Sequence, residues 1–264
     1  MSFMERYGPW AIIAGASEGM GAFFARKIAA QGVACILIAL DGPLEELAEE
    51  IRSSTGVACI TAKIDLSAPD AFDQIIEVAD DREIGLYIAN AGGDYSGSRY
   101  LDNDIANWLG LMRLNIATTM QSCHHFGRQM RKRGRGGVLL VNSGGCYGGG
   151  SFLTTYTACK GFLLNFAEGL WAELRPFGVD VLTVILGMTD TPKFRHLMAE
   201  KGLVVPDDIA SPEAVAEIAL QRLAHGPVHH WGLRDDEAGP GGLSAADRRA
   251  RVLQMDAATA QMYS

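Results

Sequence analysis

The sequence predicts an α/β protein: a doubly wound parallel sheet with helices on both faces, in a single domain. Short apolar runs alternate with segments whose apolar residues recur at helical spacing, which is the pattern of β-α units. The run Ala34–Leu40 is apolar throughout, as expected of a parallel strand that is buried on both faces. No shift in composition divides Trp10–Trp231, and 264 residues with 48% hydrophobic and 20% charged residues suit one globular unit.

Each expected strand is a short apolar run, and each expected helix repeats its apolar residues every three to four positions. The strands are expected at Trp10–Ala14, Ala34–Leu40, Val57–Ile64, Ile84–Ala89, Val138–Asn142, Asp180–Leu186 and Val228–Trp231. The helices are expected at Met20–Gln31, Leu44–Ile51, Ala71–Ala79, Asp104–Met130 with one break, Tyr156–Leu174, Pro192–Lys201 and Pro212–Leu223. In the first helix the apolar positions include Met20, Phe24 and Ile28, and Gly32 ends it.

The alternation of elements predicts one Rossmann-like domain over residues 1–231. The remaining tail, residues 232–264, begins polar and rich in glycine. Ser244 and Asp247 then resemble a capping box, so we expect a short last helix that packs on the same domain.

Charge and cysteine content exclude several classes of function. The net charge is 23 − 31 = −8, which argues against nucleic acid or an anionic membrane as the main partner. The N-terminus does not read as a targeting signal, and no run of 18 apolar residues suggests a membrane span. Five cysteines without a C-x-x-C pair fit a cytoplasmic setting. The adjacent His124 and His125 point about 100° apart on a helix, so no metal site is expected.

A glycine-rich turn follows the first expected strand and opens the first expected helix. Its sequence is Gly15-Ala-Ser-Glu-Gly19-Met-Gly21. Glycines at such a turn let backbone N–H groups approach a pyrophosphate at the positive end of the helix. A turn without a ligand is the alternative, because the spacing is G-x-x-x-G-x-G rather than G-x-G-x-x-G.

A second motif, Tyr156-Thr-Ala-Cys-Lys160, places two polar side chains on one face of a helix. A Lys ammonium beside a Tyr hydroxyl lowers the Tyr pKa and makes that residue a usable acid or base. Two unrelated surface residues are the alternative. Ser143 favours the functional interpretation, because it lies at the carboxyl end of an expected strand, where sites form in parallel sheets.

These motifs together resemble the short-chain dehydrogenase/reductase family over about Tyr7 to Trp231. The resemblance implies a catalytic group formed by Asn115, Ser143, Tyr156 and Lys160. It implies a cofactor site formed by Gly15, Ser17, Glu18, Gly19, Met20, Gly21, Leu40, Asp41, Asp65, Leu66, Asn90, Ala91, Gly92, Tyr156, Lys160, Gly187, Thr189 and Thr191. By resemblance, Tyr156 exchanges a proton with the substrate oxygen and Ser143 holds that oxygen. Lys160 lowers the Tyr156 pKa and binds the nicotinamide ribose, and Asn115 anchors a water that relays protons.

The expected cofactor is NAD(H), with NADP(H) as the alternative. Counting from Gly15, Ala39 and Leu40 occupy the positions that usually carry an Asp for NAD or a basic residue for NADP. Asp41 and Glu18 lie nearby in sequence, and two carboxylates disfavour the 2′-phosphate of NADP.

The expected substrate is a bulky apolar ketone or alcohol. Its pocket is expected to be lined by Tyr95, Gly145, Tyr147, Phe152, Met188 and Phe194. The opening Tyr7-Gly-Pro-Trp-Ala, the segment His124-His125-Phe126 and the segment from Leu186 to Pro192 are similar to hydroxysteroid dehydrogenase-like members of the family, which implies a steroid-like substrate.

The sequence is compatible with two other functions. One is an NADPH-dependent reductase of a small or acyl ketone, and the other is a nicotinamide-binding regulator without turnover, which the presence of all the catalytic residues argues against. The apolar face Phe162, Phe166, Leu170 and Trp171 is expected to be intramolecular core, while the family resemblance implies a homodimer or homotetramer.

Overall fold

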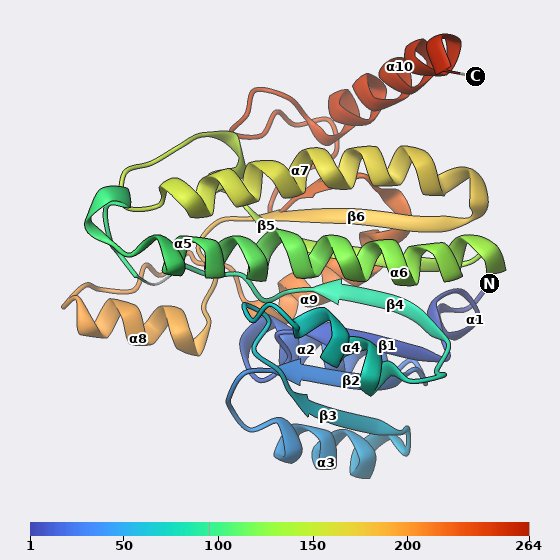
Figure 1. The fold of residues 1–264 in the computed structure, drawn as a ribbon, viewed down its shortest axis with the longest axis horizontal. Helices are drawn as coiled ribbons and strands as arrows, with labels where there is room; N and C mark the ends of the chain where they lie inside the picture. Colours follow the sequence, from blue (N-terminus) through green and yellow to red (C-terminus); the bar gives the residue numbers. More distant parts are fainter. Residues whose placement is uncertain (95, 264) are drawn as a thin grey trace.

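Seven parallel strands form one sheet in the order β3-β2-β1-β4-β5-β6-β7 (Figure 1). The structure is a computed structural model that describes residues 1–94 and 96–263, with side chains to residue 254. The strands are β1 Trp10–Ala14, β2 Ala34–Ala39, β3 Cys59–Lys63, β4 Ile84–Ala89, β5 Gly136–Ser143, β6 Val179–Leu186 and β7 Val228–His230. The order reverses between β1 and β4, so the predicted doubly wound parallel sheet is confirmed.

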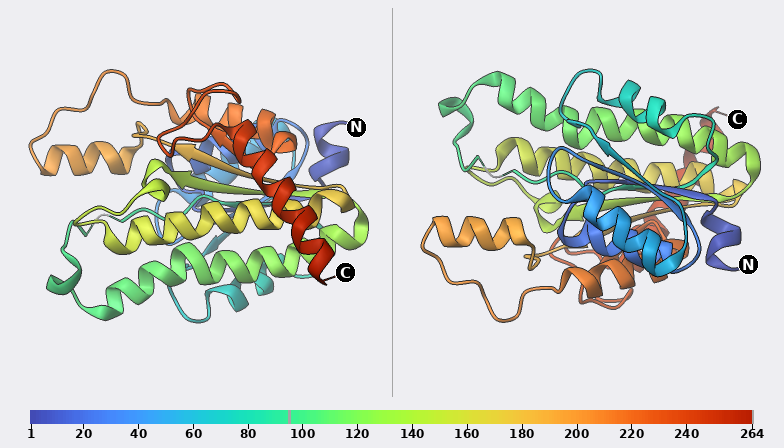
Figure 2. Two further views of the ribbon diagram at one scale, coloured as in Figure 1. Left: turned by 90° about the horizontal axis from the view of Figure 1, so that it is seen from above. Right: turned by 90° about the horizontal axis from the view of Figure 1, so that it is seen from below.

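Helices cover both faces of this sheet, as Figure 2 shows edge-on. The α-helices are α1 Phe3–Tyr7, α2 Gly19–Ala29, α3 Leu44–Thr55, α4 Ala71–Ala79, α5 Ile105–Met112, α6 Thr118–Arg133, α7 Thr154–Leu174, α8 Pro192–Glu200, α9 Pro212–Arg222 and α10 Ala245–Tyr263. Shorter helical segments are η1 Tyr100–Asp102, η2 Arg113–Ala117, η3 Gly144–Tyr147, η4 Arg175–Phe177 and η5 Leu223–His225. Over the described part of the chain, none of the helices has the length and apolar character needed to cross a membrane.

Two hydrophobic cores lie on opposite faces of the sheet because successive strand residues point to opposite sides. One core joins Ile13 and Leu37 to apolar residues of α2, α3 and α9. The other joins Ile12 and Ile36 to residues of α4, α6 and α7. The strand predicted at Ala34–Leu40 is therefore buried on both faces, and Leu40, which follows β2, is exposed.

Two features differ from the expected elements, and a third, the expected break in a long helix, takes a specific form. Helix α1 was not predicted, because five residues are too few to show a helical repeat; a capping box between Ser2 and Glu5 starts it. The break expected within Asp104–Met130 is a π-helical segment, η2. The last helix, α10, runs for 19 residues rather than a short stretch, and Ser244 caps it through a bond from the Asp247 N–H.

The sheet brings the carboxyl ends of its strands to one edge, and the loops that leave this edge carry the predicted motifs. The glycine turn follows β1, the segment Asn90-Ala91-Gly92 follows the neighbouring β4, and Ser143 ends the next strand, β5. Parallel pairing therefore places residues up to 128 positions apart in the chain at one crevice, where open sheets bind ligands.

Helix α1 is anchored to the far strand β6 through the carboxylate of Asp180. The buried Tyr7 hydroxyl donates to Asp180 over 2.7 Å, and the Arg6 guanidinium pairs with the same group over 2.6 Å. Burial and the nearby carboxylate raise the pKa of Tyr7, so its hydroxyl stays a donor.

Tyr7→Phe is expected to lower the free energy of unfolding by about 1–3 kcal/mol, because a bond to a charged acceptor is lost without a change of shape. Urea unfolding of the two proteins measures the difference. Tyr100→Phe, at a position with 45% exposure, is the control and should shift stability by less than about 0.5 kcal/mol. Equal midpoints for Tyr7→Phe and the unchanged protein would remove this anchor from the account.

Candidate active site and nucleotide cleft

The turn between β1 and α2 requires glycine at its key positions. Gly15 and Gly19 have φ angles of 90° and 55°, in the region that favours glycine. A Cβ atom at Gly21 would overlap the carbonyl oxygen of Gly15, and one at Gly15 would lie 2.6 Å from the N atom of Ala91. The turn is thus packed against the loop after β4, and the Gly15 and Ala16 N–H groups donate to the Ile38 carbonyl of β2.

This turn forms one wall of a cleft of about 320 Å³ at the carboxyl edge of the sheet. The volume lies at the lower end of the range of small-molecule sites. Of the residues predicted for a cofactor site, the lining contains Gly15, Ser17, Glu18, Gly19, Met20, Leu40, Asp41, Asp65, Leu66, Asn90, Ala91, Gly92 and Thr191. The structure thus brings together residues that the sequence disperses from position 15 to position 191.

Other residues predicted for the cofactor site lie outside this lining. Gly21 supports the turn from behind, and Thr189 forms an isolated bridge with Ala210 near the end of β6. Four lining residues had no signal in the sequence, because they come from loops or a neighbouring helix: Ile64, Ser67, Leu114 and Lys193.

The cleft has the donors and shape that a nucleotide requires. Glu18 occupies the N-cap of α2 without capping it by its side chain, so the positive end of the helix faces the cleft uncapped. Asn90 donates through Nδ2 to the Gly15 carbonyl over 2.7 Å, while its buried Oδ1 has no hydrogen-bond partner among the described residues. The glycine backbone, helix end and open amide oxygen fit a phosphate-bearing nucleotide.

Ser143 and Tyr156 meet beside Gly145. A Cβ atom at Gly145 would lie 3.6 Å from both the Ser143 Oγ and the Tyr156 Cε1 atoms. The Ser143 Oγ accepts a hydrogen bond from the Gly145 N–H over 3.2 Å, which starts η3. The side chains of Ser143 from β5 and Tyr156 from α7 therefore border one small space.

Lys160 lies one turn along α7 from Tyr156 and is buried. Its Nζ donates to the Val141 carbonyl over 3.2 Å and lies 5.5 Å from the Tyr156 ring centroid. Burial lowers the pKa of Lys160 to about 8, so the group is mostly charged at neutral pH but loses its proton readily above it.

Asn115 projects from η2 toward the same place. Its Nδ2 donates to the Leu111 carbonyl over 3.0 Å, and its buried Oδ1 has no partner among the described residues. A Cβ atom at Gly92 would overlap this Oδ1 and lie 3.2 Å from Lys160 Nζ, so the three groups share one space. π-Helical segments of this kind often occur at functional sites.

Burial has the largest influence on the pKa of Tyr156. It raises this pKa, the hydrogen bond with Ser143 opposes the increase, and the charge of Asp94 adds to it. The Lys160 ammonium lies over the Tyr156 ring, 5.5 Å from its centroid, and the lowering of the Tyr156 pKa that the family resemblance implies stays a prediction.

Asn142 connects Ser143 on β5 to Lys160 on α7, and the sequence did not predict this role. Its Oδ1 accepts from the Ser143 N–H over 2.8 Å, and its Nδ2 donates to the Lys160 carbonyl over 3.2 Å. One buried amide thus ties the end of β5 to the helix that carries Tyr156. Its position next to Ser143 was the only signal available, and strand residues at that position are usually apolar.

The residues predicted to line a substrate pocket are only partly brought together. Gly145 lies beside Ser143 and Tyr156, whereas the Tyr147 ring stacks on His230. Phe152 and Met188 are exposed on separate loops, Phe194 is half-buried on α8, and Tyr95 lies outside the described residues.

Comparison with known proteins places this geometry in a family. The family model described as short chain dehydrogenase matches residues 9–202. A 7β-hydroxysteroid dehydrogenase from Clostridium sardiniense is 33% identical over 197 residues, covering 73% of this chain and 74% of that protein. A solved structure from work on 7β-hydroxysteroid dehydrogenase stereoselectivity has a TM-score of 0.81 and 28% identity, covering 89% of this chain and 92% of the other. A short-chain dehydrogenase from Sphingobium yanoikuyae in complex with NADPH shares the fold, with a TM-score of 0.78, 24% identity and coverage of 97% and 96%.

The buried lysine predicts a pH dependence of stability. Because the folded pKa of Lys160 is lowered to about 8 from 10.5, the unfolded chain binds more protons between these values. The free energy of unfolding of the unchanged protein should therefore rise with pH, relative to Lys160→Met, by up to about 3 kcal/mol between pH 8 and 10.5.

Urea unfolding of both proteins at several pH values measures this difference. Lys63→Met, at an exposed site at the end of β3, is the control and should follow the unchanged protein. Parallel curves for the unchanged protein and Lys160→Met would contradict the burial of a charged lysine.

Proposed function

The chain belongs to the short-chain dehydrogenase family, whose members of this type are alcohol and ketone oxidoreductases, and we propose that it interconverts a bulky, steroid-like ketone and its alcohol with NAD(H). One observation carries the proposal: Ser143, Tyr156, Lys160 and Asn115 converge beside a glycine-lined nucleotide cleft. A binding protein without turnover would need the cleft but not this group of side chains.

In the proposed reaction Tyr156 is the proton donor to the substrate oxygen during reduction and the acceptor during oxidation. Its raised pKa keeps the hydroxyl protonated at neutral pH, which suits donation to a carbonyl. Ser143, which faces the same space, holds the oxygen by a hydrogen bond. The residues of the glycine turn, the loop after β4 and Thr191 would hold the cofactor. When bound, the nicotinamide supplies or accepts the hydride.

Lys160 and Asn115 are proposed to return the proton to Tyr156. The Asn115 Oδ1 is an open acceptor that faces the space shared with Lys160 Nζ, which suits a bound water between them. A lysine with a pKa of about 8 can both give and take a proton near neutral pH. The orphaned amide oxygen thus has a function in proton transfer.

The preference for NAD(H) rests on charge in the cleft. Three carboxylates line it, from Glu18, Asp41 and Asp65, and they would repel the additional phosphate of NADP. Lys193 lines the same cleft and supports the alternative, as does the NADPH bound to the relative from Sphingobium yanoikuyae. We propose NAD(H) because the acidic groups outnumber the basic one in the described lining.

The proposal of a steroid-like substrate rests on two observations: exposed apolar side chains on the loops near the site, and the similarity to known relatives. Phe152, Leu153 and Met188 are exposed on the loops that follow β5 and β6, the strands whose carboxyl ends border the site. Exposed apolar groups on these two loops suit a large apolar ligand. The 7β-hydroxysteroid dehydrogenases that the chain resembles act on such a ring system, as their name states.

Self-association and a cytoplasmic setting complete the proposal. The residues Phe162, Phe166, Leu170 and Trp171 are partly buried against the core. On the neighbouring α5 and α6, Leu109, Met112 and Met120 remain exposed, which supports a homodimer or homotetramer through this side. All five cysteines are free, as in a reducing compartment.

A panel of steroid, aromatic and aliphatic ketones and alcohols, read at 340 nm with each cofactor, tests the proposal. We expect turnover of steroid-like compounds, with kcat/KM at least about tenfold higher for NAD(H), equivalent to about 1.4 kcal/mol. A higher kcat/KM with NADP(H) would reverse the cofactor assignment. Turnover confined to small or acyl ketones would replace the substrate class, and no turnover of any compound would contradict the proposed activity.

A further inference from the structure

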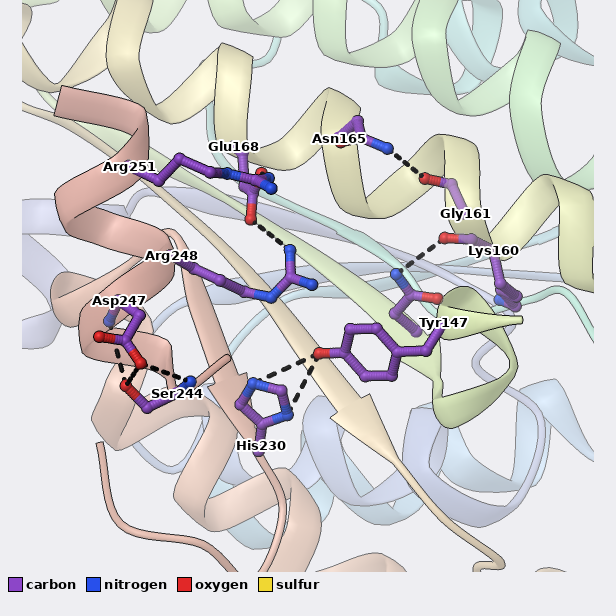
Figure 3. Close-up of polar contacts among 11 residues, drawn as sticks. Tyr147, Lys160, Gly161, Asn165, Glu168, His230, Ser244, Asp247, Arg248 and Arg251 are labelled. Atoms are coloured by element: carbon purple, nitrogen blue, oxygen red, sulfur yellow. Dashed lines mark hydrogen bonds and ion pairs between the residues drawn. The ribbon is translucent and has the colours of Figure 1, made fainter. Parts of the chain in front are cut away.

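The loop that follows Ser143 rests on the C-terminal part of the chain. This loop is η3, which runs from Gly144 to Tyr147. At its start the Ser143 Oγ accepts a hydrogen bond from the Gly145 N–H. The Tyr147 ring stacks on His230, with centroids 5.8 Å apart and planes inclined by 14°. Its hydroxyl lies 3.3 Å from both ring nitrogens of His230, as Figure 3 shows.

Arg248 of α10 contacts the same ring. Its guanidinium carbon lies 5.0 Å from the Tyr147 ring centroid. In the view of Figure 3 the hydroxyl end of the Tyr147 ring points toward His230, and the Arg248 guanidinium lies above it. An aromatic ring with a guanidinium on its face has few other rotamers open to it, so Tyr147 is held in one orientation.

Arg248 is in turn fixed to α7 by a buried ion pair. Its Nη1 donates to Glu168 Oε1 over 2.8 Å, and the two side chains are 7% and 5% exposed. Arg251, one turn further along α10, pairs with the other oxygen of Glu168 over 2.8 Å but is 43% exposed. Buried charges are tolerated when they are paired, so the position of Arg248 is determined by that of Glu168.

The segment before α10 closes on the same two rings. A Cβ atom at Gly241 would lie 2.6 Å from Tyr147 Cε1, and one at Gly239 would lie 2.5 Å from His230 Cε1. Such distances are too short for any side chain, so the backbone is in direct contact with both rings. Residues 239–248 therefore cover Tyr147 from more than one side.

These contacts form a continuous chain that links the end of β5 to α7. From Ser143 the chain passes through η3 to Tyr147, then to Arg248, and then to Glu168 on α7. Helix α7 carries Tyr156 and Lys160, which lie two to three turns before Glu168. The same two elements are also joined at the other end by Asn142.

We propose that Arg248 is a positioning residue: by joining Glu168 to the ring of Tyr147, it fixes the loop that follows Ser143 relative to the helix that carries Tyr156. Arg248 does not touch the reacting atoms in this account. The catalytic meaning of the inference rests on the proposed function, in which the Ser143 and Tyr156 hydroxyls must face one substrate oxygen.

The test compares Arg248→Met and Gly241→Ala in the full-length protein. The first removes the guanidinium from the ring, and the second drives a methyl group into the Tyr147 ring while leaving the ion pair in place. We expect each to lower kcat, counted per cofactor-binding site, by about tenfold or more, since misplacement by about 1 Å can cost about 10²-fold. We expect unchanged cofactor affinity, and Arg248→Lys should recover part of the loss.

A second readout does not depend on turnover. Hydrogen exchange of the amides in residues 144–147, followed by mass spectrometry, should become about tenfold faster in both variants. Two matched controls keep the contact with Tyr147. Arg251→Met loses an ion pair to the same Glu168, and Gly169→Ala adds a methyl group to α7 in open space. Both should match the unchanged protein in exchange and stay within about twofold in kcat.

Each outcome decides the inference. Faster exchange in Arg248→Met and Gly241→Ala, with both controls unchanged, supports it. Unchanged exchange in a folded Arg248→Met or Gly241→Ala overturns it, and so does an equal loss in Arg251→Met, which would mean that any loosening of α10 has this effect. If the unchanged protein turns over no alcohol or ketone, the proposed function fails while the exchange measurement still decides whether Arg248 positions the loop.

Discussion

The central strands of this protein are buried on both faces, and the placement of every functional group depends on that constraint. A strand between two helix layers has no room for polar side chains along its length, since each would need a buried partner. The amide and hydroxyl side chains of the site that follow or end β4 and β5, Asn90, Asn142 and Ser143, therefore lie at the carboxyl ends, next to the glycine turn after β1. The glycine-lined cleft and the proposed catalytic group are two parts of that one edge.

Within this edge, burial also determines the chemistry. Burial lowers the pKa of Lys160 to about 8 and raises that of Tyr156, so the tyrosine hydroxyl stays protonated at neutral pH. Asn142 accepts from the Ser143 N–H and donates to the Lys160 carbonyl, which joins the backbone at the end of β5 to the backbone of α7. The Arg248–Glu168 ion pair extends this connection to the C-terminal helix.

The sequence predicted the sheet because an apolar run such as Ala34–Leu40 and a helical repeat such as that of α2 are local patterns. A glycine-rich turn after a strand predicts a backbone conformation that only glycine adopts readily, and Gly15 has such a conformation, with a φ angle of 90°. The sequence could therefore indicate where the cleft lies. It missed Lys193 and Asn142, whose roles come from tertiary contacts.

The most direct measurement compares Tyr156→Phe with the unchanged protein, for both turnover and cofactor binding. The hydroxyl is the proposed proton donor, and phenylalanine keeps the ring that packs beside Lys160. We predict that kcat falls by at least about 10²-fold, which is the lower end of the rate gain from general acid–base catalysis, while the cofactor dissociation constant stays unchanged. Turnover equal to that of the unchanged protein would remove Tyr156 from the mechanism and contradict the account.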